Sequence, residues 1–529
     1  MKPKTFLKAA ALTGITAAAA PLLNKKLNTP QGKKFMYAAA DTAVNGVLSG
    51  VNAVLPDISR GDILDFTPDC TFAGTKNFLK TPMTNAAWSL GYSKASILPE
   101  DVTAQPYYLG GYPAYPPNAA VDVLDDQMIR CIALSDGSGR GIAVFAVIDC
   151  IGISNRDVNE IRAGLTGFAA ENNIVSINIC ATHAHSCIDT LGAYGDPAAV
   201  LKNNPVKIIE GETDFVSGRN PAFMEHLKTT TVSLIQNAVL NMKPGKLYRA
   251  VQDGSKFLQA KRPPKVMPPE IVSLNFRPAD GSMGTRAVFM SAQPAQFSPN
   301  SRTVSADYPY YLCEQIEQNG EHAIVFQGAA LGIFPPRGNS DSLSTLSHAE
   351  SIQLYGKTLG QYCLTAEFSE IAPILNLRHR KILVPVSNQF VTLLAKLQVV
   401  NNELISYGDK AAEVMLVSEL GYAELGTDVK LALIPGEIAP ELVIGGCADS
   451  ADSYDGTAWD HASLQEIAGG KLTVIGLCND EIASIIPDND FGSKFAPHHY
   501  EEIISAGKYT ASKIVTEFRA MLDTIAYAD

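Results

Sequence analysis

The sequence lacks the cysteine spacings that mark disulfide frameworks and zinc-thiolate sites. Its nine cysteines are odd in number, are scattered over 529 residues and include no Cys-x-x-Cys pair. Small disulfide-stapled folds and Cys-ligated metal sites are therefore excluded as expectations. We expect most of these cysteines to be buried side chains that pack as apolar groups.

Basic residues are also in deficit. The formal net charge is -12 and the isoelectric point is about 5.3. Binding to a nucleic-acid backbone needs a basic stripe that neutralises phosphates, and the sequence has none. Nucleic acid is therefore not an expected partner. The glycine cluster between Asp136 and Gly141 opens no helix, so it predicts a hairpin turn and not a phosphate-binding loop.

Apolar residues, in contrast, are plentiful. They make up 46% of the chain, enough to fill a large core. Residues 128–149 predict a β-hairpin, residues 154–172 an amphipathic helix capped by Ser154, and the segment before His183 a buried strand. This order predicts an α/β fold with mixed multi-stranded sheet layers and covering helices. Because no repeat or low-complexity linker interrupts residues 87–529, we expect them to form one domain.

The first 60 residues form an N-terminal helical extension in this prediction. Residues 1–23 combine a basic start with an Ala-rich apolar run, which is typical of a signal peptide or a membrane-associating helix. An Ala-rich helix that ends at Pro21 is the alternative, and both interpretations stay open. Residues 36–56 predict a second helix of similar composition. Export or membrane association, with peripheral membrane contact, is favoured over a cytoplasmic location.

Two histidines follow the buried strand that ends near residue 181. His183 and His185 are one residue apart, and residues two apart in an extended segment point to the same side. Both imidazoles can therefore face one ion or one substrate at the carboxyl end of a strand, where open α/β sheets place their sites. Solvated or carbonyl-bonded histidines are the structural alternative.

Five strand-end motifs occur in a fixed order along the chain: THAHS, SADYP, QGAALGIFPPR, IPGE and GLCNDEIASIIP. Their order and context resemble the neutral/alkaline ceramidase family over roughly residues 87–515. Members of that family are zinc-dependent amidases that cleave the N-acyl bond of ceramide. The resemblance implies a ceramidase-like catalytic domain and an N-acyl amide lipid as substrate. We expect no counterpart of the immunoglobulin-like domain that follows in the long members.

The resemblance also assigns roles to individual residues. It implies that His183 and Glu437 ligate zinc and that His185 contacts the reacting amide. Imidazole nitrogen and carboxylate oxygen are both ordinary zinc ligands. Arg262 falls in a basic segment that lines the substrate channel of the family, with a solvated charge as the alternative.

Three site positions of the family are replaced in this chain. Gln293 stands where the family has a second histidine ligand, and Ser484 stands where it has a tyrosine ligand. Phe334 or Pro335 takes the place of the nucleophilic serine. An amide binds zinc more weakly than imidazole, and a catalytic zinc normally has three protein ligands. Three acidic residues remain as candidates to complete an altered shell: Asp149, Asp189 and Asp307.

The sequence therefore leaves two main functions open, and a different hydrolase with a rebuilt metal shell is a third possibility. In the first, the chain is a ceramidase-like amide hydrolase of reduced or altered activity, in which a zinc-bound water replaces the missing serine. In the second, it is a non-catalytic protein of the same fold that binds a lipid, a small-molecule amide or a partner without turnover. Fold alone does not separate the two, because one fold supports many functions.

Overall fold

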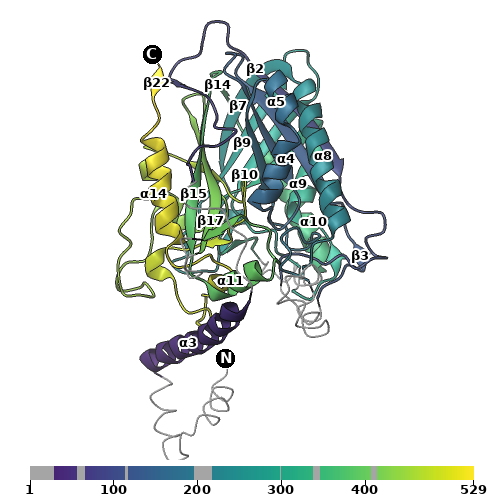
Figure 1. The fold of residues 1–529 in the computed structure, drawn as a ribbon. Coiled ribbons are helices and arrows are strands. Elements are labelled where there is room, and N and C mark those ends of the chain that lie inside the picture. Colours follow the sequence, from purple (N-terminus) through teal and green to yellow (C-terminus); the bar gives the residue numbers. More distant parts are fainter. Residues whose placement is uncertain are drawn as a thin grey trace, which may run out of the picture.

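Two β-sheets packed face to face, with helices on their outer sides, organise the chain (Figure 1). The structure, a computed structural model, describes residues 29–55, 66–112, 117–195, 217–297, 299–336, 346–406 and 414–528. The predicted signal-like segment, residues 1–23, lies outside this part of the chain. The division into an N-terminal extension and one larger domain stays a prediction.

The larger sheet mixes parallel and antiparallel pairs. Its strands lie in the order β12 (Glu321–Gln327), β10 (Gly284–Met290), β9 (Glu270–Pro278), β7 (Lys243–Asp253), β2 (Trp88–Ser96), β4 (Met128–Ser135), β5 (Ile142–Ile148) and β6 (Ile174–Ala181), and β14 (Ser369–Ile371) pairs with β7. The pairs β5–β6 and β10–β12 are parallel. The predicted hairpin is confirmed, since β4 and β5 pair antiparallel across the glycine turn.

The smaller sheet holds the C-terminal half of the fold. Its strands lie in the order β15 (Leu375–Val386), β17 (Val414–Leu425), β18 (Val429–Leu433) and β20 (Thr473–Ile475), and β16 (Leu404–Ser406) pairs with β17. Short strands add four two-stranded ladders: β1 (Phe78–Leu79) with β22 (Tyr527–Ala528), β3 (Asp122–Val123) with β11 (Thr303–Val304), β8 (Gln259–Ala260) with β13 (Ile333–Phe334), and β19 (Glu437–Ile438) with β21 (Ser484–Ile485).

Helices cover the outer face of each sheet (Figure 1). On the larger sheet they are α4 (Asn155–Ala163), α5 (Thr166–Glu171), α8 (Pro221–Leu240), α9 (Tyr308–Glu317) and α10 (His348–Leu364), and on the smaller sheet α14 (Thr510–Leu522). Further short helices are α11 (Gln389–Lys396), α12 (Pro440–Ile444), α13 (Leu464–Ile467), η2 (Ser255–Phe257), η3 (Asp488–Asp490) and η4 (Glu501–Ile503). The predicted α/β fold with mixed sheet layers and covering helices is confirmed.

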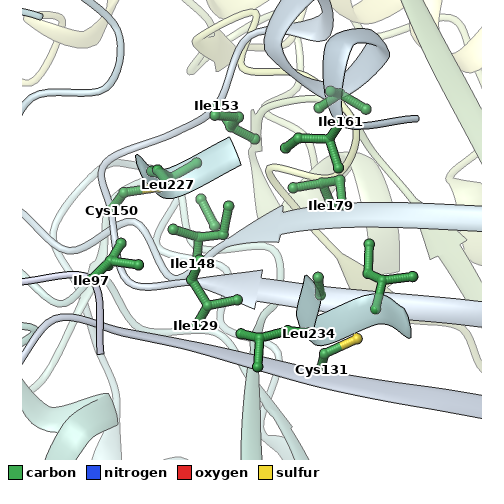
Figure 2. Close-up of a cluster of buried hydrophobic side chains, with 14 of the residues drawn as sticks. Ile97, Ile129, Cys131, Ile148, Cys150, Ile153, Ile161, Ile179, Leu227 and Leu234 are labelled. Atoms are coloured by element: carbon green, nitrogen blue, oxygen red, sulfur yellow. The ribbon is translucent and has the colours of Figure 1, made fainter. Parts of the chain in front are cut away.

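The period-two alternation along the strands explains the layers. On β4, Ile129 and Cys131 face the helices, whereas Ile132 and Leu134 face the smaller sheet. Figure 2 shows Ile129 with Ile148, Ile179, Leu227 and Leu234 in the helix-side core. Burying a side chain of this size stabilises the fold by about 1.5–3 kcal/mol. Strands with two buried faces are therefore mainly apolar, as in β5, and their few polar side chains, such as Arg130 on β4, are paired inside the fold.

The predicted helix over residues 154–172 forms as two helices. Ser154 caps α4 as expected, since its hydroxyl oxygen accepts a hydrogen bond from the Asp157 amide. The backbone then breaks at Gly164 and Leu165, and α5 continues to Glu171. Glycine is a weak helix former, which explains the break.

Helix α3 (Pro30–Val54) lies beside α11 and projects from the body (Figure 1). Polar groups attach it. Lys494 contacts Asp41 and Asn45, and the Asn52 side chain donates to the carbonyl of Gln389 over 3.0 Å. Five large apolar side chains of α3 are exposed, beside exposed polar ones such as Lys33 and Ser49: Phe35, Val44, Val47, Val51 and Val54. Within the described part of the chain, no helix combines the length and apolar character needed to cross a membrane.

Candidate functional site

Four strand ends bring together the site positions that the resemblance identified. His183 follows β6, Gln293 follows β10, Glu437 begins β19 and Ser484 begins β21. Strands β19 and β21 pair in parallel, with Glu437 directly opposite Ser484. His183 and Gln293 follow strands of the larger sheet, Glu437 and Ser484 lie in the β19–β21 ladder, and all four side chains are buried.

His183 and Glu437 converge, as the sequence predicts. Their Nε2 and Oε1 atoms lie 3.6 Å apart. Gln293 reaches the same oxygen, because its side-chain amide donates a hydrogen bond to Glu437 Oε1. The replaced ligand position thus lies beside the two retained ones, and it presents a donor to the carboxyl group.

The backbone at His183 is strained, and its ring is oriented by one contact. Its φ is +64°, in the left-handed region that residues other than glycine rarely adopt. Its Nδ1 lies 2.8 Å from the carbonyl oxygen of Ile151, so Nδ1 carries the proton of the neutral ring. The lone pair of Nε2 is therefore directed at Glu437. Strain of this kind is common at functional sites.

His185 lies next to His183 with its ring less constrained. The two ring centroids are 4.7 Å apart with perpendicular planes, and Tyr112 covers His185 with a centroid distance of 5.0 Å. Within the described residues, no side chain hydrogen-bonds to either ring nitrogen, and the Gly111 backbone is the polar group nearest the ring. Gly111 lies against the ring at φ +109°, and a Cβ there would stand 2.5 Å from the His185 Cα. Only glycine fits this contact.

Burial keeps the site uncharged at neutral pH. It lowers the pKa of His183 to about 4. Burial and then the neighbouring His183 lower the pKa of His185 well below its ordinary value. Burial, reinforced by Glu501, raises the pKa of Glu437 to about 8. Glu437 is therefore mostly protonated at pH 7, and both histidines are neutral.

This donor set does not fit a catalytic zinc ion. Such a site needs three protein ligands, and within the described ranges no three His, Cys, Asp or Glu side chains gather in the required way. Gln293 turns an N–H toward Glu437, and an N–H has no lone pair for a metal. No step through zinc is derived for this site.

The three acidic candidates are engaged elsewhere. Asp149 pairs with buried Arg130 at 3.0 Å. Asp189 accepts hydrogen bonds from the backbone amides of the turn that follows it, at residues 191, 192 and 194. Asp307 caps α9 by accepting from the Tyr308 amide, and it also accepts from the Gln296 amide. Each carboxylate organises a turn, a helix start or a buried ion pair.

Pro335 and Arg262 complete the set of predicted residues. Pro335 follows β13. In this strand the Ile333 carbonyl accepts a hydrogen bond from the backbone amide of Gln293, 2.9 Å away. It lies beside the site but offers no hydroxyl. The guanidinium of Arg262 is 3.1 Å from Glu501 and 2.9 Å from Glu502, and it is almost fully buried. This pairing favours a structural role for Arg262 over substrate contact, which stays a prediction.

Glu481 is a site residue that sequence reasoning missed. One of its oxygens accepts from the Ala483 amide over 2.7 Å, and the other has no partner within the described residues. Burial and then the nearby Glu437 raise its pKa well above the ordinary value. The signal available was its place in GLCNDEIASIIP, three residues before Ser484.

An apolar cavity of about 100 Å³ adjoins this group. His183 and Glu481 supply polar groups to its wall. The rest of the wall is mainly apolar. It comes from four parts of the chain: the loop after the His183 strand, α11, the smaller sheet and the C-terminal loops. In that order, the main apolar residues are Leu191, then Phe390 and Leu394, then Leu404 and Leu416, and finally Ile482 and Ile504. The arrangement therefore places uncharged hydrogen-bonding groups beside an apolar cavity.

No protein-family model and no curated protein matches the sequence. Solved structures do match. The neutral ceramidase of Pseudomonas aeruginosa superposes with a TM-score of 0.60 at 13% identity, over 83% of this chain and 74% of that one. A ceramidase complexed with C2 gives a TM-score of 0.57 at 14% identity, over 84% of this chain and 77% of that one. Such low identity shows the fold alone. The chain therefore has the fold of the neutral ceramidases.

Proposed function

We propose that this chain binds a lipid with an uncharged amide head group, without zinc-assisted turnover. The observation that carries the proposal is the apolar cavity with His183 and Glu481 in its wall. An apolar chain fits the wall of Leu, Ile, Val and Phe side chains, while the amide meets the polar end.

The electrostatics of the site support an uncharged head group. The pKa of Glu437, raised to about 8, means that this carboxyl group mostly holds a proton near pH 7, and burial raises the pKa of Glu481 as well. A protonated carboxyl group donates a hydrogen bond, and an amide carbonyl oxygen accepts one. The neutral histidines add nitrogen acceptors. Among the described residues, the cavity wall offers an anionic head group no lysine or arginine, and Arg262 is enclosed by carboxylates.

The replaced positions explain why turnover is not part of the leading proposal. Proline at 335 has no nucleophilic atom, and Gln293 donates to the carboxyl group that would otherwise face a metal. His185 is a weak base, since its pKa lies well below the ordinary value. General-base catalysis is most effective when the base has a pKa near the working pH.

Amide hydrolysis is the second candidate, and one observation favours it. Within the described residues, no side chain hydrogen-bonds to the ring nitrogens of His185, whose ring packs against that of His183. They are free to contact the amide of a bound lipid. The neutral ceramidases of matching fold support this candidate by analogy.

Binding of a fluorescent long-chain N-acyl amide, dispersed below the concentration at which it aggregates, tests the leading proposal. We expect saturable binding by the wild-type chain. Leu394→Trp fills the cavity and should weaken binding at least tenfold, whereas Leu393→Trp, on the same helix but outside the cavity wall, should not. Absent binding, or equal loss in both variants, would contradict the proposal.

Product analysis in the same samples separates the two candidates. Release of free fatty acid in the presence of added zinc, abolished by His183→Ala and Glu437→Gln, would establish the hydrolase and overturn binding without turnover. Intact amide after prolonged incubation, together with metal-free protein, is the result that we expect.

Peripheral membrane contact belongs to the same proposal. The exposed valines of α3 lie on a helix that packs beside α11, and α11 lines the cavity. Ile504 lines the cavity and is itself 42% exposed, so the cavity wall reaches the protein surface. We propose that this face rests on a lipid surface and that the chain is exported or membrane-associated.

Flotation with phosphatidylcholine vesicles tests this contact. Val47→Asp with Val51→Asp should reduce the bound fraction severalfold, because burying carboxylates in an apolar phase is costly. Leu240→Asp on α8, at a side chain 69% exposed against 67% for Val47, is the control. Equal vesicle binding by all three proteins would contradict membrane contact through α3 and leave the cavity proposal intact.

A further inference from the structure

Two buried cysteines face each other across the junction of the two sheets. Cys180 lies in β6, three residues before His183, and Cys478 follows β20, three residues before Glu481. Their sulfur atoms are 3.4 Å apart, and both side chains are at most 1% exposed. In the part of the chain that the structure describes, this is the one pair of cysteines in sulfur–sulfur contact.

The backbone holds this pair in a favourable register. Cys180 and Cys478 form an antiparallel bridge. It is flanked by hydrogen bonds from the Ala181 amide to the Leu477 carbonyl (3.1 Å) and from the Asn479 amide to the Ile179 carbonyl (2.7 Å). These bonds make the cysteines a non-hydrogen-bonded pair, in which opposite Cα atoms lie about 4.5 Å apart. That separation is within the range that disulfides span, about 4.4–6.8 Å.

We propose that Cys180 and Cys478 become a disulfide when the chain folds in an oxidising compartment. One thiolate attacks the disulfide bond of an oxidant, either a small-molecule disulfide or a dithiol oxidoreductase, and displaces one sulfur of the oxidant as a thiol. The second cysteine then attacks the mixed disulfide and releases the other sulfur. The two cysteines lose two hydrogens and gain one S–S bond, and the oxidant is reduced to thiols.

The timing of this reaction follows from burial. Both side chains are buried away from any oxidant in solution, and burial raises the pKa of Cys478 well above its ordinary value, so this thiol holds little of the reactive thiolate in the folded chain. Oxidation therefore takes place before the two sheets close over the pair. The remaining cysteines differ in their contacts. Cys150 and Cys187, for example, donate to the carbonyls of Gly152 and Ser305.

The cross-link would fix a strained loop that carries the site. Three residues with side chains in this loop, Leu477, Asn479 and Ala483, have positive φ values of 48°, 66° and 68°. Asn479 already ties the loop to β6, since its side-chain oxygen accepts from the Ile179 amide over 2.9 Å. A covalent bond one residue away would hold Glu481 and Ser484 against the strand that ends at His183. The proposal does not depend on what the site binds.

Peptide mapping of the full chain tests the cross-link directly. The protein is folded in a glutathione redox buffer, unfolded in the presence of an alkylating agent and digested without reduction. We expect one peptide pair linked through Cys180 and Cys478, lighter than the two free peptides by two hydrogens, and the other cysteines alkylated. Alkylation of every cysteine, or a different linked pair, would overturn the proposal.

Thermal unfolding supplies a second, independent readout. Oxidised wild-type protein should melt about 2–5 °C above its reduced form, because the cross-link restricts the unfolded chain. Cys478→Ala should abolish this difference between oxidised and reduced samples. Cys131→Ala, a similarly buried cysteine in the helix-side core, should keep it. An equal difference in both variants would contradict the assignment.

Discussion

Two buried polar clusters lie on either side of the Cys180–Cys478 bridge, and they differ in how completely their groups are paired. In the paired cluster, Arg162 donates two hydrogen bonds of 2.9 Å to Glu419, and Asn479 donates a third. His379 lies 3.1 Å from Glu419 and 2.9 Å from the Ser176 hydroxyl. In the site cluster of Glu437, Glu481, His183 and His185, no cation pairs with a carboxyl group at comparable distance among the described residues.

The pKa shifts record the same difference. Burial alone would raise the pKa of Glu419, but Arg162 and His379 bring it below the ordinary value. Burial raises the pKa of Glu437 to about 8, with only weak opposition from Ser484 and Arg262. The paired cluster thus contributes to one stable arrangement of the two sheets. The site cluster keeps hydrogen-bonding capacity unused, which is typical of a binding or catalytic site.

The largest expected effect comes from breaking the paired cluster. Arg162→Met leaves Glu419 buried without its main cation, and we expect a loss of about 3–5 kcal/mol in the free energy of unfolding. Chemical denaturation at pH 7 measures it. Glu481→Gln, at a similarly buried carboxyl group without a cation, should change stability by about 1 kcal/mol or less. Equal losses would show that the two clusters do not differ energetically.

The second effect is a pH dependence of opposite sign in the two clusters. The folded-state pKa of Glu437, about 8, lies above the ordinary 4.5. Its stabilising contribution is therefore complete below pH 4.5 and is lost as the pH rises through 8. Wild-type protein should lose stability relative to Glu437→Gln between pH 5 and pH 8, by at most about 1.4 kcal/mol per pH unit.

For Glu419 the sign is reversed, because its pKa is lowered in the folded state. Its contribution is present above the ordinary pKa of 4.5 and is lost as the pH falls toward the folded value. Denaturation midpoints measured from pH 3 to pH 9 show both slopes in one series. A Glu437→Gln curve parallel to wild type from pH 5 to pH 8 would contradict the raised pKa.

A smaller contrast is expected between two histidines. His379→Ala removes the partner of Ser176 and Glu419, and we expect a cost of about 1–3 kcal/mol. His185→Ala removes a ring to which no described side chain hydrogen-bonds and should cost about 1 kcal/mol or less. Thermal denaturation compares the two. A larger cost at His185 would indicate a structural role that its contacts do not show.

Gln293→His should have the smallest effect on metal-free stability and yet sharpen the comparison most. The change places an imidazole nitrogen, as a third metal ligand, beside His183 and Glu437. We expect stoichiometric zinc binding that the wild-type chain lacks, measured by metal analysis after dialysis, with a rise in melting temperature only when zinc is present. Gln293→Asn keeps the amide and should bind no zinc. Zinc bound to both variants would contradict the conclusion that the wild-type donor set does not fit a zinc ion.

Much of the site geometry could be predicted from the sequence. The hairpin, the strand before His183 and the convergence of His183 with Glu437 all follow from motifs whose order along the chain matches a known fold. Local pattern was sufficient because each residue sits at the end of a clear apolar strand. The break in the helix at Gly164 was not foreseen, since one glycine only weakly disfavours a helix.

The cavity and the surroundings of Arg262 could not be predicted in this way. The cavity wall draws on α11 and the adjoining smaller sheet, from a stretch of chain without a strong period, and on loops near Ile482 and Ile504. The partners of Arg262 are carboxylates more than 200 positions away in the sequence. Contacts over such separations depend on tertiary packing, and no single strand or helix pattern encodes them.

The dispersed origin of the site also bears on how the chain folds. His183 follows β6, an edge strand of the larger sheet, and Glu481 follows β20, an edge strand of the smaller one. Contacts over long sequence separations form slowly, because closing a large loop costs entropy before any contact compensates it. Ligand binding therefore reports on completed folding. A lipid that touches both residues would also raise the unfolding midpoint of the whole chain, because only the folded state binds it.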